Sequence, residues 1–178
     1  GWNHIGLVIC GGGLRSPDPE IHERVTPFLL SCHEYLKDSA GPGKWRGGFG
    51  VVYRWKADGD NIPCAMFGSG IMEDTAPSGL KGGKRAPPYV LKIIRSDGTV
   101  IDADTNTFYT IYKGDIVEIY SSGGGGFGDP FEREPEKVLE DVRNELISIE
   151  SAERDYGVVI NPDTLEIDWE RTEQLRSR

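Results

Sequence analysis

The sequence predicts a mainly β protein, an antiparallel sandwich or barrel, with α-helices at its C-terminal end. Three observations carry this expectation. Short stretches rich in β-branched and aromatic residues recur between positions 51 and 120, with turn residues between them. After position 135 the apolar residues change to helical spacing. Glycine accounts for 24 of the 178 residues, and its runs suit neither helix nor strand interiors.

The first half of the chain is predicted to alternate between strands and glycine-rich loops. Residues 29–36 are predicted to form a strand, although a short helix fits these residue types nearly as well. At 51–55, Val51, Tyr53 and Trp55 alternate with Val52 and Arg54, as expected when a strand buries one face. The Asp-Gly turn at 97–98 makes 89–103 a hairpin. The predicted strands are 1–10, 29–36, 51–55, 64–67, 89–95, 107–112 and 116–120.

The C-terminal segment carries helix signals. In 135–147 the buried stripe is Val138, Leu139, Val142 and Leu146, preceded by a proline suited to the first helical turn. Ser148 is expected to cap a second helix that Gly157 ends. A small hairpin at 158–167 and a last helix at 169–176, capped by the aspartate before it, complete the chain. The expected division is a glycine-rich β domain, 1–128, and an acidic helical segment, 129–178.

Composition excludes several classes of protein. The net charge is −9, of which −8 falls on residues 129–178, so nucleic acid and anionic membranes are not expected partners. No apolar run approaches the roughly 20 residues of a membrane span. Three cysteines, Cys10, Cys32 and Cys64, do not make a disulfide framework. Nothing in the sequence directs the protein elsewhere, so a cytoplasmic location is expected.

Candidate reactive sites are weak when judged on the residues alone. The run Gly123–Gly126 resembles a phosphate cradle, but it lacks the lysine and hydroxyl of a P-loop, and Asp129 would repel phosphate. A tight packed turn is the favoured interpretation of this run. The histidines and cysteines match no common zinc spacing. Arg46, among glycines, can reach a carboxylate or phosphate; a surface or interface ion pair is the favoured role.

Four segments resemble one family. Residues 38–50 (DSAGPGKWRGGFG), 79–83 (GLKGG), 113–142 with the glycine run, and 148–159 are similar in sequence and in order to the hydantoinase B family. This family includes components of N-methylhydantoinase and 5-oxoprolinase and the large subunits of acetone and acetophenone carboxylases. The resemblance runs from about position 23 to about 176. It covers only the C-terminal part of usual members, which implies a separate small subunit or a fragment.

The resemblance implies a function for a complex rather than for this chain alone. It implies a small structural subunit of an ATP-dependent ketone carboxylase of the acetophenone carboxylase type, which makes a 3-oxo acid from ketone and bicarbonate. The alternatives are a subunit of an ATP-dependent hydantoinase or oxoprolinase that hydrolyses cyclic amides, and a non-enzymatic interaction module. The implied partners are a larger hydantoinase-B-like subunit and ATPase-type hydantoinase-A-like subunits. ATP and a divalent metal are expected on those subunits.

No catalytic, cofactor-binding or metal-binding residue is therefore assigned to this chain. The residues of the family motifs are instead expected to have structural or interface roles: Trp45, Arg46, Gly47, Gly48, Gly123, Gly124, Gly125, Gly126, Asp129, Pro130, Tyr156 and Gly157.

Overall fold

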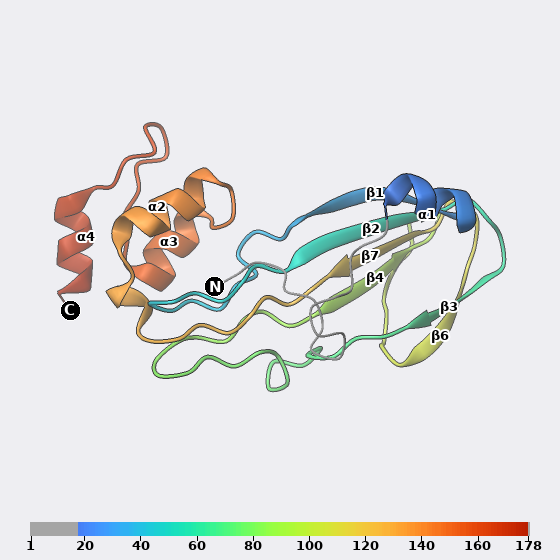
Figure 1. The fold of residues 1–178 in the computed structure, drawn as a ribbon, viewed down its shortest axis with the longest axis horizontal. Coiled ribbons are helices and arrows are strands. Elements are labelled where there is room, and N and C mark those ends of the chain that lie inside the picture. Colours follow the sequence, from blue (N-terminus) through green and yellow to red (C-terminus); the bar gives the residue numbers. More distant parts are fainter. Residues whose placement is uncertain (1–17, 178) are drawn as a thin grey trace.

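The computed structural model describes residues 18–177. The molecule is elongated, with the β-strands and a short N-terminal helix at one end, the C-terminal helices at the other and long extended segments between them (Figure 1). This arrangement confirms the predicted class, a mainly β fold with C-terminal helices. The strand predicted at 1–10 lies outside the described residues.

Five strands form an open antiparallel sheet in the order β1-β2-β7-β4-β5. Among residues 18–177, β1 and β5 each pair with a single neighbouring strand, so these five strands do not close into a barrel. Its members are β1 (Phe28–Tyr35), β2 (Val51–Ala57), β7 (Ile116–Tyr120), β4 (Val90–Ile94) and β5 (Val100–Asp102). The Asp97-Gly98 turn joins β4 to β5 as expected, with Gly98 at a φ of 89°.

A two-stranded ribbon, β3 (Ile62–Met66) paired with β6 (Thr107–Ile111), packs against one face of this sheet. The two layers share a hydrophobic core that includes Ile93 and Ile111, neither of which is exposed to solvent. Although β6 is followed directly by β7, the two strands do not pair. The chain instead crosses between layers at the turn around Gly114.

One short helix was not expected from the sequence. Helix α1 (Pro19–Val25) precedes β1, with the Asp18 side chain accepting a hydrogen bond from Glu20 N–H (2.9 Å) and Pro19 in the first turn. This is the ordinary start signal of a helix. The helix buries none of its residues, which explains why no apolar stripe indicates it.

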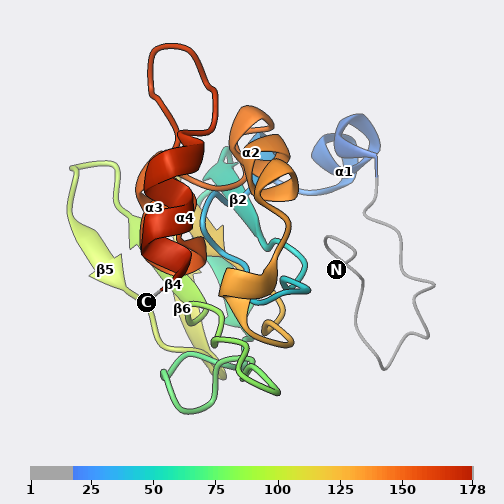
Figure 2. The same ribbon diagram turned by 90° about the vertical axis from the view of Figure 1, so that its left-hand side faces the viewer.

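The helical lobe comprises the 3-10 turn η2 (Pro130–Glu132), α2 (Pro135–Arg143), α3 (Ile149–Tyr156) and α4 (Trp169–Arg176). Figure 2 views the molecule from this end, with the helices in front of the strands. Two caps agree with the prediction: Ser148 accepts from Ser151 N–H (3.1 Å), and Gly157 ends α3 at a φ of 63°. Asp168 caps α4 as expected, accepting from Arg171 N–H (3.1 Å).

Helix α2 is shorter than predicted. The expected helix ran to 147, but α2 ends at Arg143, and Glu145 takes a φ of 59°. The Leu146 N–H then donates to Asp141 O (2.9 Å), which closes the helix in the manner of a glycine-ended turn. Beyond α3, the predicted hairpin is reduced to a single antiparallel bridge between Ile160 and Ile167.

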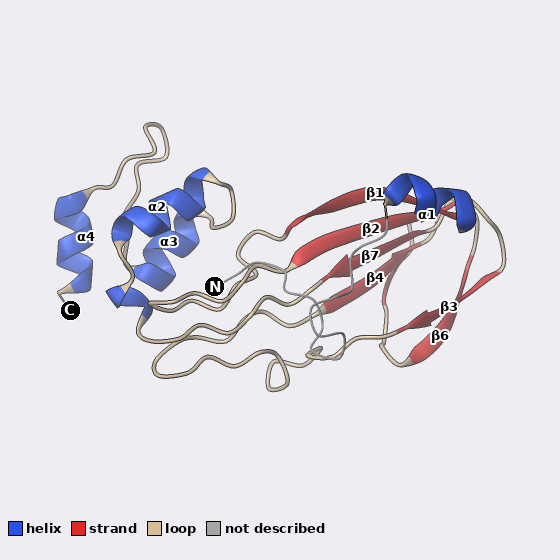
Figure 3. Cartoon of the chain, viewed as in Figure 1, coloured by secondary structure: helices blue, strands red, loops and turns tan. Residues whose placement is uncertain are grey.

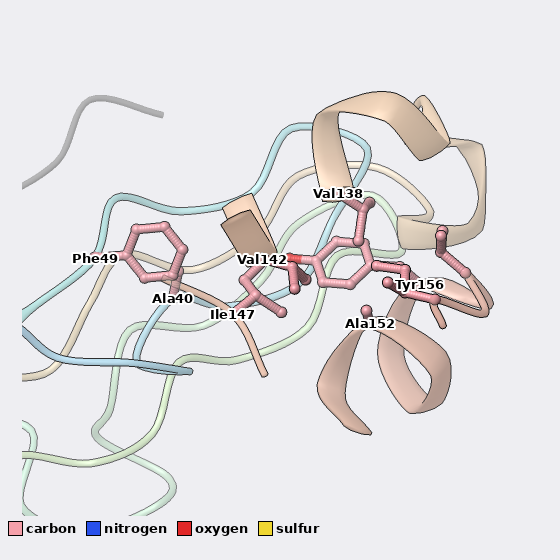
Figure 4. Close-up of a cluster of buried hydrophobic side chains, with 9 residues drawn as sticks. Ala40, Phe49, Val138, Val142, Ile147, Ala152 and Tyr156 are labelled. Carbon is pink, nitrogen blue, oxygen red and sulfur yellow. The ribbon is translucent and has the colours of Figure 1, made fainter. Parts of the chain in front are cut away.

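The lobe has its own apolar core, centred on Val138, Ala152, Tyr156 and Val158 (Figure 4). Ala40 and Phe49, which lie before β2 in the sequence, belong to the same core. The extended segments therefore reach into the helical lobe rather than stopping at its surface.

Candidate functional site

Three extended segments, 38–50, 78–86 and 121–128, lie side by side between the sheet and the helical lobe, and we call them the glycine bundle (Figure 3). Their backbones exchange hydrogen bonds outside any regular sheet. Gly41 N–H donates to Gly124 O (2.8 Å), and Gly124 N–H donates to Gly48 O (2.9 Å). Gly126 N–H donates to Lys84 O (2.9 Å). The run 123–126 thus contacts both other segments.

These contacts explain why the positions are glycine. A Cβ atom built on Gly47 would overlap the carbonyl group of Gly124, and one on Gly126 would overlap that of Pro42. Both neighbours are backbone groups rather than flexible side chains, so a Cβ atom could be accommodated only if the two segments moved apart. The other glycines of the bundle whose added Cβ would lie closer than 3.0 Å to a backbone atom are Gly41, Gly43, Gly50, Gly79, Gly83, Gly123 and Gly125.

The tight turn expected at the glycine run is therefore wrong. Gly123–Gly126 is extended, and none of its residues has a positive φ. The amides of Gly123, Gly124 and Gly126 already donate to backbone carbonyls, so they are not available to cradle a phosphate. The run packs backbone against backbone instead.

A buried charged cluster, the Arg–Asp–Arg cluster of Arg46, Asp141 and Arg133, ties the glycine bundle to the helical lobe. Both the Nε and an Nη of Arg46 donate to the two carboxylate oxygens of Asp141, each at 2.9 Å. Arg133 donates to the same carboxylate at 2.9 Å. The Arg46 guanidinium also stacks on the Phe49 ring, 4.3 Å from its centroid. The Asp141 side chain is 7% exposed, so the ion pair of Arg46 is buried. Of the two expected roles, the surface ion pair is therefore wrong, and the interface ion pair stays a prediction.

Tyr156 lies beside this cluster in the lobe core. Burial raises the pKa of its phenol far above the usual value, and the Asp141 carboxylate raises it further, while Arg133 and Arg46 partly oppose the shift. Tyr156 therefore remains protonated at neutral pH and serves as a packing residue, 2% exposed.

The remaining predicted site residues also gather at this junction. Asp129 accepts from Phe131 N–H (2.9 Å) and begins η2, whose first residue, Pro130, is buried. Gly157 closes α3, and a Cβ added to it would lie 3.3 Å from the Phe131 ring. Trp45 differs from the others, because its side chain is 56% exposed.

Sequence reasoning missed Asp141 and Arg133. A usable signal for Asp141 is its place next to Val142 and three residues after Val138, on the buried stripe of α2. An acid on such a stripe requires a buried cation, and Arg46 is the partner that the family motif offered. Arg133 carries no comparable signal, because it lies between two short helical elements.

A second charged cluster stabilises the far end of the sheet. The buried Asp115 carboxylate accepts from Arg95 (2.6 Å), Ser96 N–H (3.0 Å) and Tyr112 N–H (2.9 Å). Burial acts to raise the pKa of Asp115, but these hydrogen bonds and the Arg95 charge outweigh it, and the pKa lies below its usual value. Asp115 thereby fastens the β4–β5 turn to the β6–β7 connection.

The structure also contains an open apolar pocket of about 420 Å³ between α1, β3 and the sheet. Burial raises the pKa of the Cys64 thiol in its wall, which disfavours the reactive thiolate. The pocket is lined by His22, Thr26, Pro27, Phe28, Trp55, Cys64, Ala65, Met66 and Val117.

Within residues 18–177, no three His, Cys, Asp or Glu side chains are grouped so that they could hold a metal ion. No helix in that range has the length and apolar character needed to cross a membrane. Cys32 and Cys64 are unpaired, and Cys10 lies outside the described residues.

The family follows from comparison with known proteins. The family model for hydantoinase B/oxoprolinase matches residues 1–130, well over half of the sequence. This chain belongs to the hydantoinase B/oxoprolinase family. The match includes both the 38–50 motif and the glycine run that carried the resemblance.

Among curated relatives, caprolactamase subunit beta of Pseudomonas jessenii is 36% identical over 165 residues, covering 90% of this chain and 28% of its own length. The acetophenone carboxylase delta subunit of Aromatoleum aromaticum is 25% identical over 206 residues, covering 99% of this chain and 30% of its own length. The chain therefore spans less than a third of these relatives.

Two solved structures share the fold. The crystal structure of ATP-dependent caprolactamase from Pseudomonas jessenii aligns with a TM-score of 0.78 and 32% identity over 94% of this chain, using 29% of its own. Nucleotide-free acetone carboxylase aligns with a TM-score of 0.77 over 90% of this chain and 26% of its own. Its 23% identity supports the fold alone.

Proposed function

We propose that this chain is a structural unit of the hydantoinase-B component in an ATP-dependent complex that hydrolyses cyclic amides. The observation that carries the proposal is the 36% identity with caprolactamase subunit beta across 90% of the chain. The fold agrees with that of caprolactamase at a TM-score of 0.78. The proposal assigns the catalytic centre, ATP and a divalent metal to the rest of the complex; the small share of that relative which this chain spans, 28%, supports the assignment.

The side chains of the junction support a positioning role. The Asp141 carboxylate is saturated by two guanidinium groups, and Tyr156 is held protonated by its burial. The raised pKa of the Tyr156 phenol does not suit it to exchange a proton at neutral pH. The glycine bundle is fixed by backbone contacts, so it can hold the helical lobe at a set distance and angle from the sheet.

A ketone carboxylase is the second candidate. The acetophenone carboxylase delta subunit aligns over 99% of the chain, more than caprolactamase subunit beta does, although at only 25% identity. In this case the complex would consume ATP and bicarbonate and convert a ketone into a 3-oxo acid. The role of this chain would be the same in either reaction.

The proposed partners are the remaining portion of the hydantoinase-B component and an ATPase-type hydantoinase-A-like subunit. A cytoplasmic location is part of the proposal, because both of the proposed reactions consume ATP. Nucleic acid is not among the proposed partners, because the net charge of −9 disfavours contact with phosphate groups.

The test is to purify the tagged chain from its native cells with whatever polypeptides accompany it. The complex and the isolated chain are each incubated with Mg²⁺ and ATP plus caprolactam, or plus acetophenone and ¹³C-bicarbonate. Lactam-dependent phosphate release with ring-opened product supports the proposal, and ¹³C incorporation into a 3-oxo acid supports the second candidate. Turnover by the isolated chain would overturn the structural role.

A further inference from the structure

Three large apolar side chains stand in a row on the surface of the glycine bundle, and we call them the apolar row: Trp45, Phe127 and Leu80. Phe127 forms an antiparallel bridge with Trp45 and a parallel bridge with Leu80, so the three residues are direct neighbours across three segments. Their exposed fractions are 56%, 48% and 63%. Side chains of this size, grouped and exposed, are typical of a surface that binds another protein.

The row is held rigidly. Trp45 and Phe127 exchange two backbone hydrogen bonds, at 3.0 and 2.9 Å, and Leu80 N–H donates to Gly126 O at 2.9 Å. The backbone beneath them is the glycine bundle, whose segments touch without intervening side chains. A surface whose backbone is already fixed loses little conformational freedom on association, which favours binding.

Lys81 adds a positive charge at the end of the row. It is exposed and forms no ion pair with residues 18–177, whereas Lys44 and Lys137 nearby are paired with Glu132 and Glu134. Lys81 also adopts a φ of 53°, followed by Gly82 at 94°, in the turn closed by Gly83 N–H donating to Leu80 O (3.0 Å). A lysine in this left-handed conformation is strained, and glycine would suit the turn better.

We propose that the apolar row with Lys81 is the surface on which the remaining portion of the hydantoinase-B component docks, through an apolar side chain next to a carboxylate. The inference rests on the proposed function and deepens it. The occupant follows from length and charge: most of caprolactamase subunit beta lies outside the stretch that this chain matches. The carboxylate is the complement of Lys81, which is exposed and forms no ion pair with residues 18–177.

Another exposed apolar site serves as the control. Phe108, on the β3–β6 ribbon, is 76% exposed, more than any member of the apolar row. Strand β6, which carries Phe108, lies in a different part of the molecule, away from the glycine bundle (Figure 1). If exposure alone determined which surface binds the partner, a photoreactive residue at position 108 would crosslink to the partner as efficiently as one at position 127.

The first experiment places the photoreactive p-benzoylphenylalanine at position 127, or at 108, in the purified native complex. Irradiation at 127 is expected to give an adduct with a hydantoinase-B peptide outside residues 1–178, carrying Asp or Glu within a few residues of the linked site. The same adduct is expected whether the remaining portion of the hydantoinase-B component belongs to the same polypeptide as this chain or to a separate one. An adduct from 127 with the ATPase-type subunit, no adduct, or equal labelling from 108 would overturn the inference.

The second experiment separates docking from folding through variants at Lys81, each combined with the photoreactive residue at 127. Lys81→Glu should reduce the adduct yield at least about fivefold, and Lys81→Arg should leave it nearly unchanged. Lys81→Gly should also reduce the yield while leaving the melting temperature of the chain unchanged or higher, because it removes the charge and the strain together. Undiminished yield in Lys81→Glu would contradict the charge complementarity.

The outcomes distinguish this inference from the proposed function. If lactam-dependent ATP hydrolysis is found but the adduct from 127 falls elsewhere, the function stands and the docking surface is wrong. If the wild-type chain purifies with neither hydantoinase-B nor ATPase-type sequence, both fail.

Discussion

Replacing Gly126 by alanine should separate segments of the glycine bundle. The new methyl group would overlap the carbonyl of Pro42 and lie 2.8 Å from Gly41 O, whereas ordinary contact begins at 3.4 Å. The segments must therefore move apart by more than about 0.6 Å at Gly41 alone, and further at Pro42. Such a shift strains the two 2.9 Å hydrogen bonds of Gly126, with Lys84 and Leu80.

The cost follows from those two bonds. Leaving a buried backbone group unpaired costs about 1–3 kcal/mol, so we expect a loss of about 2–6 kcal/mol in the free energy of unfolding. For a chain of this length, the loss lowers the melting temperature by at least about 5 °C. Gly124→Ala is the matched control, because its Cβ would lie 3.3 Å from Gly48 N, a contact that a small adjustment relieves.

Urea denaturation of both variants measures the difference. Alanine reduces the freedom of the unfolded chain equally in the two, so that contribution cancels in the comparison. We expect Gly124→Ala to stay within about 1 kcal/mol of the wild type. Equal stability of the two variants would refute the argument that backbone contact, and not flexibility, requires glycine at position 126.

Three further predictions concern charge and hydrogen bonding. Asp141→Asn should lose about 3–5 kcal/mol of unfolding free energy, since it leaves two buried guanidinium groups without a counter-charge; a loss below about 1 kcal/mol in urea would contradict this. The pKa of Asp115 is lowered by folding, so its stabilisation is present above the unfolded pKa near 4 and lost as the pH falls below it. The urea midpoint should therefore fall more steeply from pH 5 to pH 3 in the wild type than in Asp115→Asn; parallel profiles would oppose this. Thr172→Val should cost about 1–3 kcal/mol, because the buried Thr172 hydroxyl accepts from Val159 N–H at 3.0 Å, whereas Thr172→Ser should retain most of the stability in thermal denaturation.

Elements with local signals were predictable from the sequence. The hairpin at Asp97-Gly98, the capping of α3 by Ser148 and its end at Gly157 each depend on one or two residues whose preferred conformation decides the structure. The end of α2 was not predictable in this way, because the left-handed residue that closes it is Glu145, which has no such preference.

The sequence indicated part of the candidate site, but neither Asp141 and Arg133 nor the arrangement of the site. The sequence indicated that the glycines and Arg46 belong together as family motifs. It could not show that Gly126 packs against Pro42, because that contact joins segments more than 80 positions apart and leaves no periodic pattern. The partner of Arg46 is likewise 95 positions away, on a helix whose apolar stripe concealed a buried acid.

The division of the chain at 128/129 remains a prediction of the sequence. The core of the helical lobe includes Ala40 and Phe49 from the first part, so the lobe and the glycine bundle share buried residues. Truncation at 128 should therefore leave those two side chains exposed.

The measurement that tests the account most directly is ATP hydrolysis by the purified native complex, compared with the isolated chain, in the presence and absence of caprolactam. We expect lactam-dependent phosphate release by a complex that contains hydantoinase-B and ATPase-type sequences, and none by the isolated chain. Lactam-dependent hydrolysis by the isolated chain, or a chain that purifies alone without such partners, would contradict it.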